Sequence, residues 1–359
     1  MGYLRFFLVI AVVHGHFVPV PNGWWIYWHH LISLFGFYTL SGFLITRVTC
    51  EIYNGTQGRV FFLLNRFMRI YPTYWVCLLF AIIVRWLVPE TANHARVVML
   101  MPSTLEQWVP QWTIFGLSNF SAVQPPRVLL APAWSLGTEL VYYLIIGLLT
   151  GRSLWRTWSA FALSVCILII LKIYKDNFYV YYFTIHGPAA IFFLGSLGYH
   201  YRHIIRKLFT LHNTATLLLI ANVVIYLPDI LGMNKPGALG MSRPILQNGM
   251  PVLLYITSAI FILVIVSLCE SKRAANISPR EQFFADISYP MYLMHWPVGI
   301  LVQYLFGLQK ITGHELFFIG GWITFFASCV IVYSVELPIK KIRVYLRMAA
   351  LKNIPATTQ

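Results

Sequence analysis

Apolar residues along this chain gather into long runs that are separated by short polar stretches rich in arginine and lysine. A run of about 17 to 25 apolar residues is long enough to cross a bilayer as a helix. Ten such windows lie at residues 4–20, 25–46, 72–89, 132–150, 156–174, 179–200, 212–228, 250–269, 286–306 and 316–336. The pattern predicts an all-α, polytopic integral membrane protein with about ten transmembrane helices.

Composition and charge agree with a membrane protein. Only 10% of the residues are charged and 58% are hydrophobic, whereas soluble domains carry roughly 25% charged residues. The net charge of +15 is dispersed among the apolar windows, so we expect membrane lipids and no nucleic acid as partners. Lysines and arginines in alternate loops divide 18 to 7. By the positive-inside bias, both termini are predicted to be cytoplasmic, in the inner membrane of the cell.

The chain reads as one membrane domain, residues 1–339, followed by a short basic cytoplasmic tail, residues 340–359. The N-terminal segment has polar residues in its middle, so we interpret it as a retained first span and not as a signal peptide. The longest opposite-side loops, residues 90–131 and 229–249, are candidates for a lid or an acceptor platform. Five cysteines without paired spacing predict neither a disulfide framework nor a metal site.

The first window contains three ionisable residues, Arg5, His14 and His16. Arg5 and His16 are eleven positions apart, which brings them within about 20° of one helix face and roughly 16 Å apart along the axis. His14 falls on the opposite face. Ionisable residues inside a span usually serve function, and the spacing favours His16. The alternatives are an ordinary basic anchor for Arg5 and an interhelical hydrogen bond for His16.

An amphipathic stretch, RVFFLLNRFMRIYPTY at residues 59–74, precedes the third window. Its Arg66 and Arg69 are three positions apart and therefore share a helix face. Two guanidinium groups at this spacing can clamp a phosphate through charge-assisted hydrogen bonds. The alternative is an interfacial helix whose arginines face anionic lipid.

The fourth window begins with PAWSLGTELVYYL, where Ser135 and Glu139 are four positions apart on one face. Helical rise puts Glu139 roughly 10 Å into the bilayer. A carboxylate at that depth needs a partner, and we expect a histidine. A purely structural ion pair is the alternative.

The ninth window contains SYPMYLMHWPV, in which Tyr292 and His295 lie between Pro290 and Pro297. Prolines in spans free backbone carbonyls, which is typical where the backbone lines a cavity. His295 is then predicted near mid-membrane, either as a functional group or as a packing histidine. His186, before Gly187 and Pro188, is a weaker candidate of the same kind.

Together these stretches resemble acyltransferase family 3, the integral-membrane O-acyltransferases of cell-envelope polysaccharides. The matching segments are Arg5 and His16 with their spacing, FYTLSGFLITR at 37–47, NRFMRIYPTYW at 65–75, WSLGTEL at 134–140 and SYPMYLMHWP at 288–297. They follow one another in order along nearly the whole chain. The resemblance implies that Arg5, His16, Arg66 and Arg69 are tied to activity.

The expected reaction moves an acyl group, acetyl in the first instance, from cytoplasmic acyl-CoA to a hydroxyl of an extracytoplasmic or lipid-linked saccharide. We expect His16 to act as general base, with Glu139 or His295 orienting it or stabilising its imidazolium. The CoA phosphates are expected on Arg66, Arg69 and Arg5. The remaining candidate substrate-binding residues are Trp134, Ser135 and Tyr292.

No tightly bound cofactor and no metal is expected, because acyl-CoA serves as donor substrate. The alternative function is a transporter or flippase of a lipid-linked saccharide, which would favour internal repeats that this sequence lacks. A structural or sensor membrane protein is a third class, but it leaves the placement of the histidines and the glutamate unexplained. Direct transfer and an acyl-enzyme intermediate both remain open, and the sequence predicts no oligomeric state.

Overall fold

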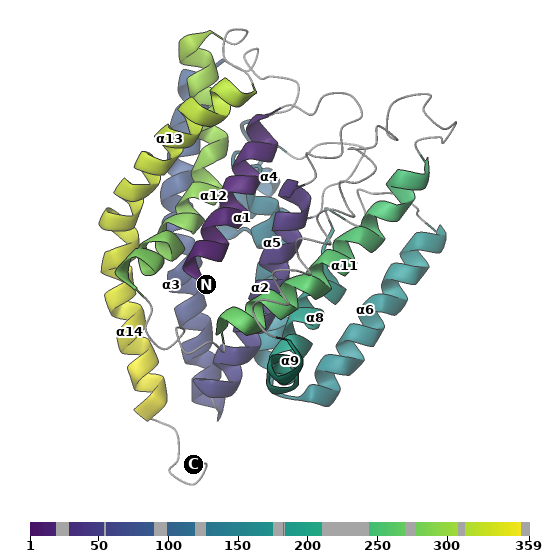
Figure 1. Cartoon of the computed structure of the whole chain (residues 1–359). Coiled ribbons are helices and arrows are strands. Elements are labelled where there is room, and N and C mark those ends of the chain that lie inside the picture. Colours follow the sequence, from purple (N-terminus) through teal and green to yellow (C-terminus); the bar gives the residue numbers. More distant parts are fainter. Residues whose placement is uncertain are drawn as a thin grey trace.

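The computed structural model describes residues 1–18, 29–53, 55–89, 99–118, 127–174, 182, 184–209, 244–269, 278–307 and 313–352. Within these ranges the regular elements are helices and no strand occurs (Figure 1). Five of the described helices are long and apolar enough to cross a membrane. The prediction of an all-α chain of membrane type is therefore confirmed.

The helices of the first half are α1 (Gly2–Phe17), α2 (His29–Glu51), α3 (Gly55–Leu87), α4 (Leu105–Thr113) and α5 (Ala133–Leu144), which the π-helical turn η3 (Ile145–Thr150) extends. Those of the middle are α6 (Leu154–Tyr174), α8 (Ala189–His200), α9 (Arg202–Leu208) and α11 (Pro244–Cys269). The last part contains α12 (Pro279–Phe306), α13 (His314–Ile331), the π-helical turn η6 (Val332–Glu336) and α14 (Leu337–Lys352).

Several boundaries differ from the predicted windows. The amphipathic stretch and the third window form one helix, α3, of 33 residues that continues through Pro72. In the sixth window, α8 begins at Ala189, directly after Pro188, because a proline is tolerated in the first turn of a helix but not in its interior. The seventh window, residues 212–228, lies outside the described residues.

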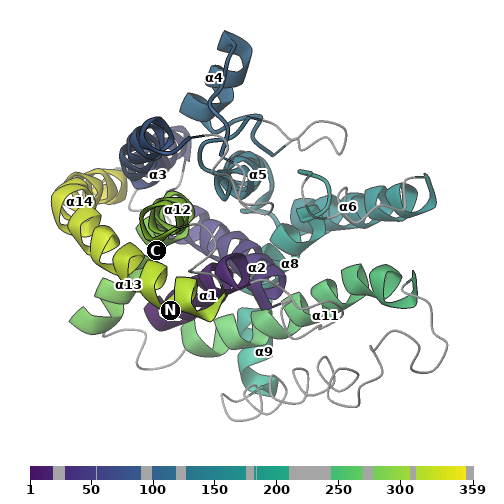
Figure 2. The same ribbon diagram turned by 90° about the horizontal axis from the view of Figure 1, so that it is seen from above.

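Helix α1 packs between α2 and α12, and α13 also contacts it (Figure 2). On the far side of α12 lie α3 and α14, whereas α8 packs against α2. Two faces of α1 are therefore covered by different helices, so residues on its two sides meet different neighbours.

Helices α2 and α8 approach closely because glycines meet backbone at their contact. A Cβ atom added at Gly42 would lie 2.0 Å from the carbonyl oxygen of Phe192, and one at Gly195 would lie 2.1 Å from that of Thr39. Thr46 also donates a hydrogen bond to Ser196 across the contact, at 2.6 Å between the oxygens. Small residues allow such approach between membrane helices.

The turn η6 separates α13 from α14 and ends at the buried residue Glu336. A π-helical turn contains an extra residue, which rotates the following helix relative to the preceding one. Helix α14 packs on α3. Residues 340–352, which we expected in a tail, are thus the continuation of a helix that lies against the bundle.

Candidate active site

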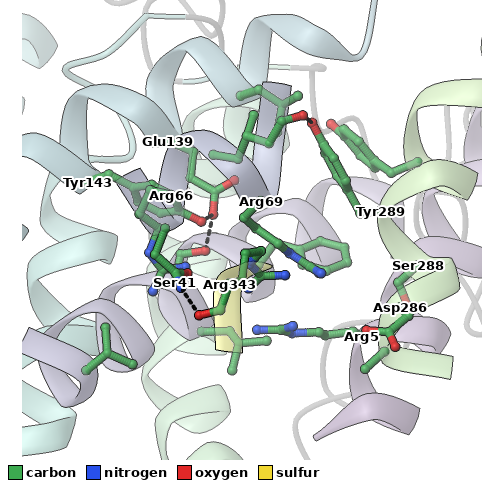
Figure 3. A pocket seen from close by; sticks show the side chains of 18 of the residues that line it. Arg5, Ser41, Arg66, Arg69, Glu139, Tyr143, Asp286, Ser288, Tyr289 and Arg343 are labelled. Carbon is green, nitrogen blue, oxygen red and sulfur yellow. Dashed lines mark hydrogen bonds between the residues drawn. The ribbon is translucent and has the colours of Figure 1, made fainter. Parts of the chain in front are cut away.

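A cavity of about 400 Å³ opens among helices α1, α2, α3, α5, α12 and α14. Its basic lining residues are Arg5, Arg66, Arg69, Lys340, Arg343 and Arg347, and its acidic ones are Glu139 and Asp286. Figure 3 shows several of these side chains around the cavity. The excess of positive charge makes the cavity suited to an anionic ligand.

The two arginines of α3 line this cavity together, as their spacing predicted for one helix face. The guanidinium of Arg66 lies over the ring of Tyr143, 4.9 Å from its centroid, a cation–π contact. Arg69 Nη1 lies 3.4 Å from Glu336 Oε2. Glu336 Oε1 in turn accepts a hydrogen bond from Thr73 Oγ1 at 2.6 Å. Both arginines are therefore held by neighbouring helices.

Arg5 enters the same cavity from α1. The positive charges of Arg66 and Arg69 and the negative charge of Glu139 all act on its guanidinium. The structure thus brings together three arginines that lie up to 64 positions apart in the sequence. This grouping agrees with the expectation that Arg5 joins the α3 pair in one site.

Glu139 has hydroxyl partners. Its Oε1 accepts hydrogen bonds from Tyr143 OH at 2.6 Å and from Ser41 Oγ. Our prediction that the partner of Glu139 is a histidine is therefore wrong. Tyr143 is four residues along the same helix, so the two side chains share a face, and Ser41 projects from the neighbouring α2.

Ser135 and Tyr292 also line the cavity, and their side-chain oxygens are 2.7 Å apart. The carbonyl oxygen of Pro132 lies 2.9 Å from Ser135 Oγ and 3.2 Å from Tyr292 OH. Each hydroxyl carries one proton, so one of them donates to this carbonyl while the other donates across the pair. The predicted pair thus forms a small hydroxyl cluster at the cavity wall. Trp134 is buried against Tyr182 and does not belong to the cavity lining.

One helical turn after Tyr292 on α12 lies His295, whose ring centroid is 6.2 Å from that of Tyr292 and which pairs with His16 of α1. His16 Nδ1 is 2.7 Å from His295 Nε2, and the rings stack with centroids 5.0 Å apart. His295 is fully buried, whereas His16 is partly exposed. His16 also contacts Trp296 and His30, with ring centroids at 5.2 Å and 5.9 Å. Neither histidine of the pair lines the cavity itself.

The hydrogen bonds of His295 determine which nitrogen of His16 is free. His295 Nδ1 lies 3.2 Å from the carbonyl oxygen of Met291, and a carbonyl only accepts, so Nδ1 carries the proton. In neutral His295, Nε2 must then accept from the Nδ1–H of His16. This arrangement leaves Nε2 of His16 with an unprotonated lone pair, as a general base requires.

His14 lies on the other side of α1. Its ring is 4.9 Å from that of Phe317 and 5.6 Å from that of His314, both on α13. The helical phase that separated His14 from His16 in the sequence is therefore confirmed. The weaker candidate His186 is exposed, in the segment before α8.

Several residues of the site escaped the sequence analysis. They are Ser41, Asp286, Glu336, Lys340, Arg343 and Arg347. The sequence could have indicated the three basic residues, because the spacing of Lys340, Arg343 and Arg347 places them on one face of a helix. Asp286 and Glu336 stand at the edge of apolar windows and gave no comparable signal.

Comparison with known families agrees with these features. A family model described as an acyltransferase domain matches residues 1–336. No curated protein and no solved structure matches the chain. The match covers every segment on which the resemblance was based, from Arg5 to Pro297. This chain therefore belongs to acyltransferase family 3, a family of membrane acyltransferases.

Proposed function

We propose that the protein is an O-acyltransferase of the cytoplasmic membrane that transfers an acyl group, acetyl in the first instance, from cytoplasmic acyl-CoA to a hydroxyl of an extracytoplasmic or lipid-linked saccharide. One observation carries the proposal. A partly exposed histidine is held by a buried histidine, whose ring centroid is 6.2 Å from that of Tyr292 in the lining of a cavity rich in arginine. A donor that carries phosphate groups at one end and a thioester at the other suits a site that has arginines in the cavity and a histidine near its wall.

The shape and charge of coenzyme A support the choice of donor. Its nucleotide carries several phosphate charges, and its pantetheine arm is long and uncharged. In the cavity, Arg5, Arg66 and Arg69 suit the phosphates, since guanidinium groups bind phosphate oxygens bidentately. The hydroxyl groups of Ser135 and Tyr292 suit the amides of the arm, which would pass them to bring the thioester toward His16.

In the proposed reaction, His16 Nε2 takes the proton from the acceptor hydroxyl while its oxygen attacks the thioester carbonyl. The new C–O bond forms and the C–S bond breaks. The CoA thiolate then takes the proton from the imidazolium and leaves as a thiol. His295 accepts the Nδ1–H of His16 throughout and so stabilises the imidazolium that forms transiently.

Glu139 receives a different role from the one that we expected. Tyr143 donates a hydrogen bond to Glu139, and the guanidinium of Arg66 packs on the ring of Tyr143. The carboxylate of Glu139 therefore orients the aromatic ring that contacts Arg66. We therefore assign Glu139 to the architecture of the donor site and His295 to the orientation of the base.

The test uses purified protein in lipid nanodiscs with acetyl-CoA and saccharide acceptors. Release of CoA thiol and mass spectrometry of the acceptor follow the two halves of the reaction. We expect both in the wild type, and neither above background in His16→Ala. Movement of a lipid-linked saccharide across the membrane without any turnover of the thioester would contradict the proposal and favour a flippase.

A further inference from the structure

Helix α14 forms one wall of the cavity although it lies outside the region that matches the family. The match ends at residue 336, and α14 begins at Leu337. Three of its basic residues, Lys340, Arg343 and Arg347, line the cavity. Their positions i, i+3 and i+7 place them on one face of the helix.

The contacts of α14 hold this face toward α3. Asn65 of α3 donates a hydrogen bond to the backbone carbonyl of Arg343, at 3.3 Å. Lys340 Nζ lies 2.9 Å from Asp286 Oδ2 of α12, and Asp286 Oδ1 accepts from Gln282 at 2.8 Å. Helix α14 is thus anchored to two neighbours by residues that surround its cavity-facing arginines.

The carboxylates around the cavity are already engaged. Asp286 pairs with Lys340, Glu336 pairs with Arg69, and Glu139 accepts from hydroxyls. Within the part of the chain that the structure describes, Arg343 and Arg347 have no carboxylate partner. The Nε of Arg343 is buried without a hydrogen-bond partner. The positive charges of Arg69 and Arg66 act on this residue, and so do the negative charges of Glu336 and Asp286, which are themselves paired with Arg69 and Lys340.

Arg343 is partly buried beside other cations, where like charges repel one another more strongly than in water, so a bound anion would stabilise this group. We infer that Arg343 and Arg347 form a phosphate-binding subsite for the nucleotide end of the donor, and specifically for the 3′-phosphate of coenzyme A. The inference rests on the proposed function. The 3′-phosphate is the phosphate group farthest from the thioester, and Arg347 is the exposed member of the pair, as expected at the mouth of the cavity.

Phosphate could also reach these arginines as a lipid headgroup, and the experiment separates the two sources. Binding of CoA and of dephospho-CoA, which lacks the 3′-phosphate, is measured for the full chain in nanodiscs of neutral lipid and in nanodiscs with anionic lipid. The variants are Arg343→Gln and Arg347→Gln. Lys341→Gln is the matched control, because Lys341 is a neighbouring exposed cation outside the cavity lining.

We expect each arginine variant to weaken CoA binding by about tenfold or more, since hydrogen bonds between charged groups are stronger than those between neutral groups. Binding of dephospho-CoA should change little, and Lys341→Gln should resemble the wild type with both ligands. Arg347 is exposed, so its variant should keep the thermal stability of the wild type and remain interpretable if Arg343→Gln folds poorly.

Equal CoA affinity in Arg347→Gln and the wild type would overturn the subsite. Equal losses of affinity for CoA and for dephospho-CoA would also overturn it. So would variants that differ from the wild type only in nanodiscs with anionic lipid, because the arginines would then bind lipid phosphate. A wild type that binds neither nucleotide would instead contradict the proposed function. The two failures are therefore distinguishable in the same assay.

Discussion

His14 and His16 are two positions apart on α1 and yet have different neighbours. His16 hydrogen-bonds to His295 on α12, whereas the ring of His14 packs against Phe317 on α13. His16 has a buried imidazole partner that fixes its tautomer. The face of α1 on which a histidine lies therefore decides which neighbouring helix its ring contacts.

Replacing each histidine by alanine tests this difference. His16→Ala should lower the rate of transfer by about 10² to 10⁴, the usual contribution of a general base. His14→Ala should retain most activity because its ring faces α13, on the other side of α1 from His295. Initial rates at matched amounts of inserted protein are the measurement. An inactive His14 variant beside an active His16 variant would overturn the assignment, and equal losses would indicate a structural role for this turn of α1.

The two arginines of α3 should respond differently to lysine. Arg66 rests on the ring of Tyr143, and Arg69 lies near the carboxylate of Glu336. Lysine keeps the charge but loses the planar fork that binds phosphate bidentately. We expect weaker binding of acyl-CoA in both variants, with Arg66→Lys the more affected because it also loses the stacking surface of the guanidinium.

The measurement is the affinity for acyl-CoA in nanodiscs, with the amount of inserted protein as control. Unchanged affinity in both variants would favour the alternative in which these arginines anchor the protein to anionic lipid. A loss confined to Arg69→Lys would contradict the larger effect that we expect for Arg66→Lys.

At the scale of elements, the contact between α2 and α8 depends on the absence of a side chain. Gly195 faces the backbone of Thr39, where a Cβ atom would come within 2.1 Å of the carbonyl oxygen. Backbone cannot move aside as a flexible side chain can. Helix α2 carries Ser41, a partner of Glu139, so this packing also supports the cavity.

Gly195→Ala should therefore lower the thermal stability of the purified protein, because the two helices must separate to admit the methyl group. Gly321→Ala is the matched control, since nothing lies within 4 Å of a Cβ atom at Gly321. Alanine inside a helix is favoured over glycine by roughly 0.5–1 kcal/mol, so this control should be neutral or slightly stabilising. Equal melting temperatures for the two variants would show that α8 can shift without cost.

At the scale of the whole molecule, several distant segments meet at one end of the bundle. Arg152, after η3, donates hydrogen bonds to the carbonyl oxygens of Thr49 and Tyr53 near the end of α2. Tyr53 also lines the cavity beside residues of α14. The orientation of this end decides whether a cytoplasmic donor can enter.

Reporter fusions read the orientation directly. A reporter that works only in the cytoplasm should be active both after Arg152 and at the C-terminus, because both positions follow loops rich in arginine and lysine. A fusion after Arg127, on the predicted opposite side, is the control and should be inactive. A periplasmic signal at Arg152 would contradict the assignment of spans and would close the cavity to cytoplasmic acyl-CoA.

The sequence by itself determined the helical class and the family, because both depend on local information. Apolar runs long enough to cross a bilayer leave the helix as the only way to satisfy the backbone of a single segment, and the described residues are helical accordingly. The motifs from Arg5 to Pro297 lie within the matched region. Helical phase likewise separated His14 from His16, since it depends only on their spacing.

Tertiary structure decided which of the possible partners on different helices meet in the site. The pairing of His16 with His295, of Glu139 with Ser41 and of Arg69 with Glu336 joins residues on different helices. Spacing along one helix carries no information on which neighbour packs against it. For the same reason the sequence left α14 as a tail: its direction depends on the extra residue of η6 and on contacts with α3 and α12, and only these bring Arg343 to the cavity.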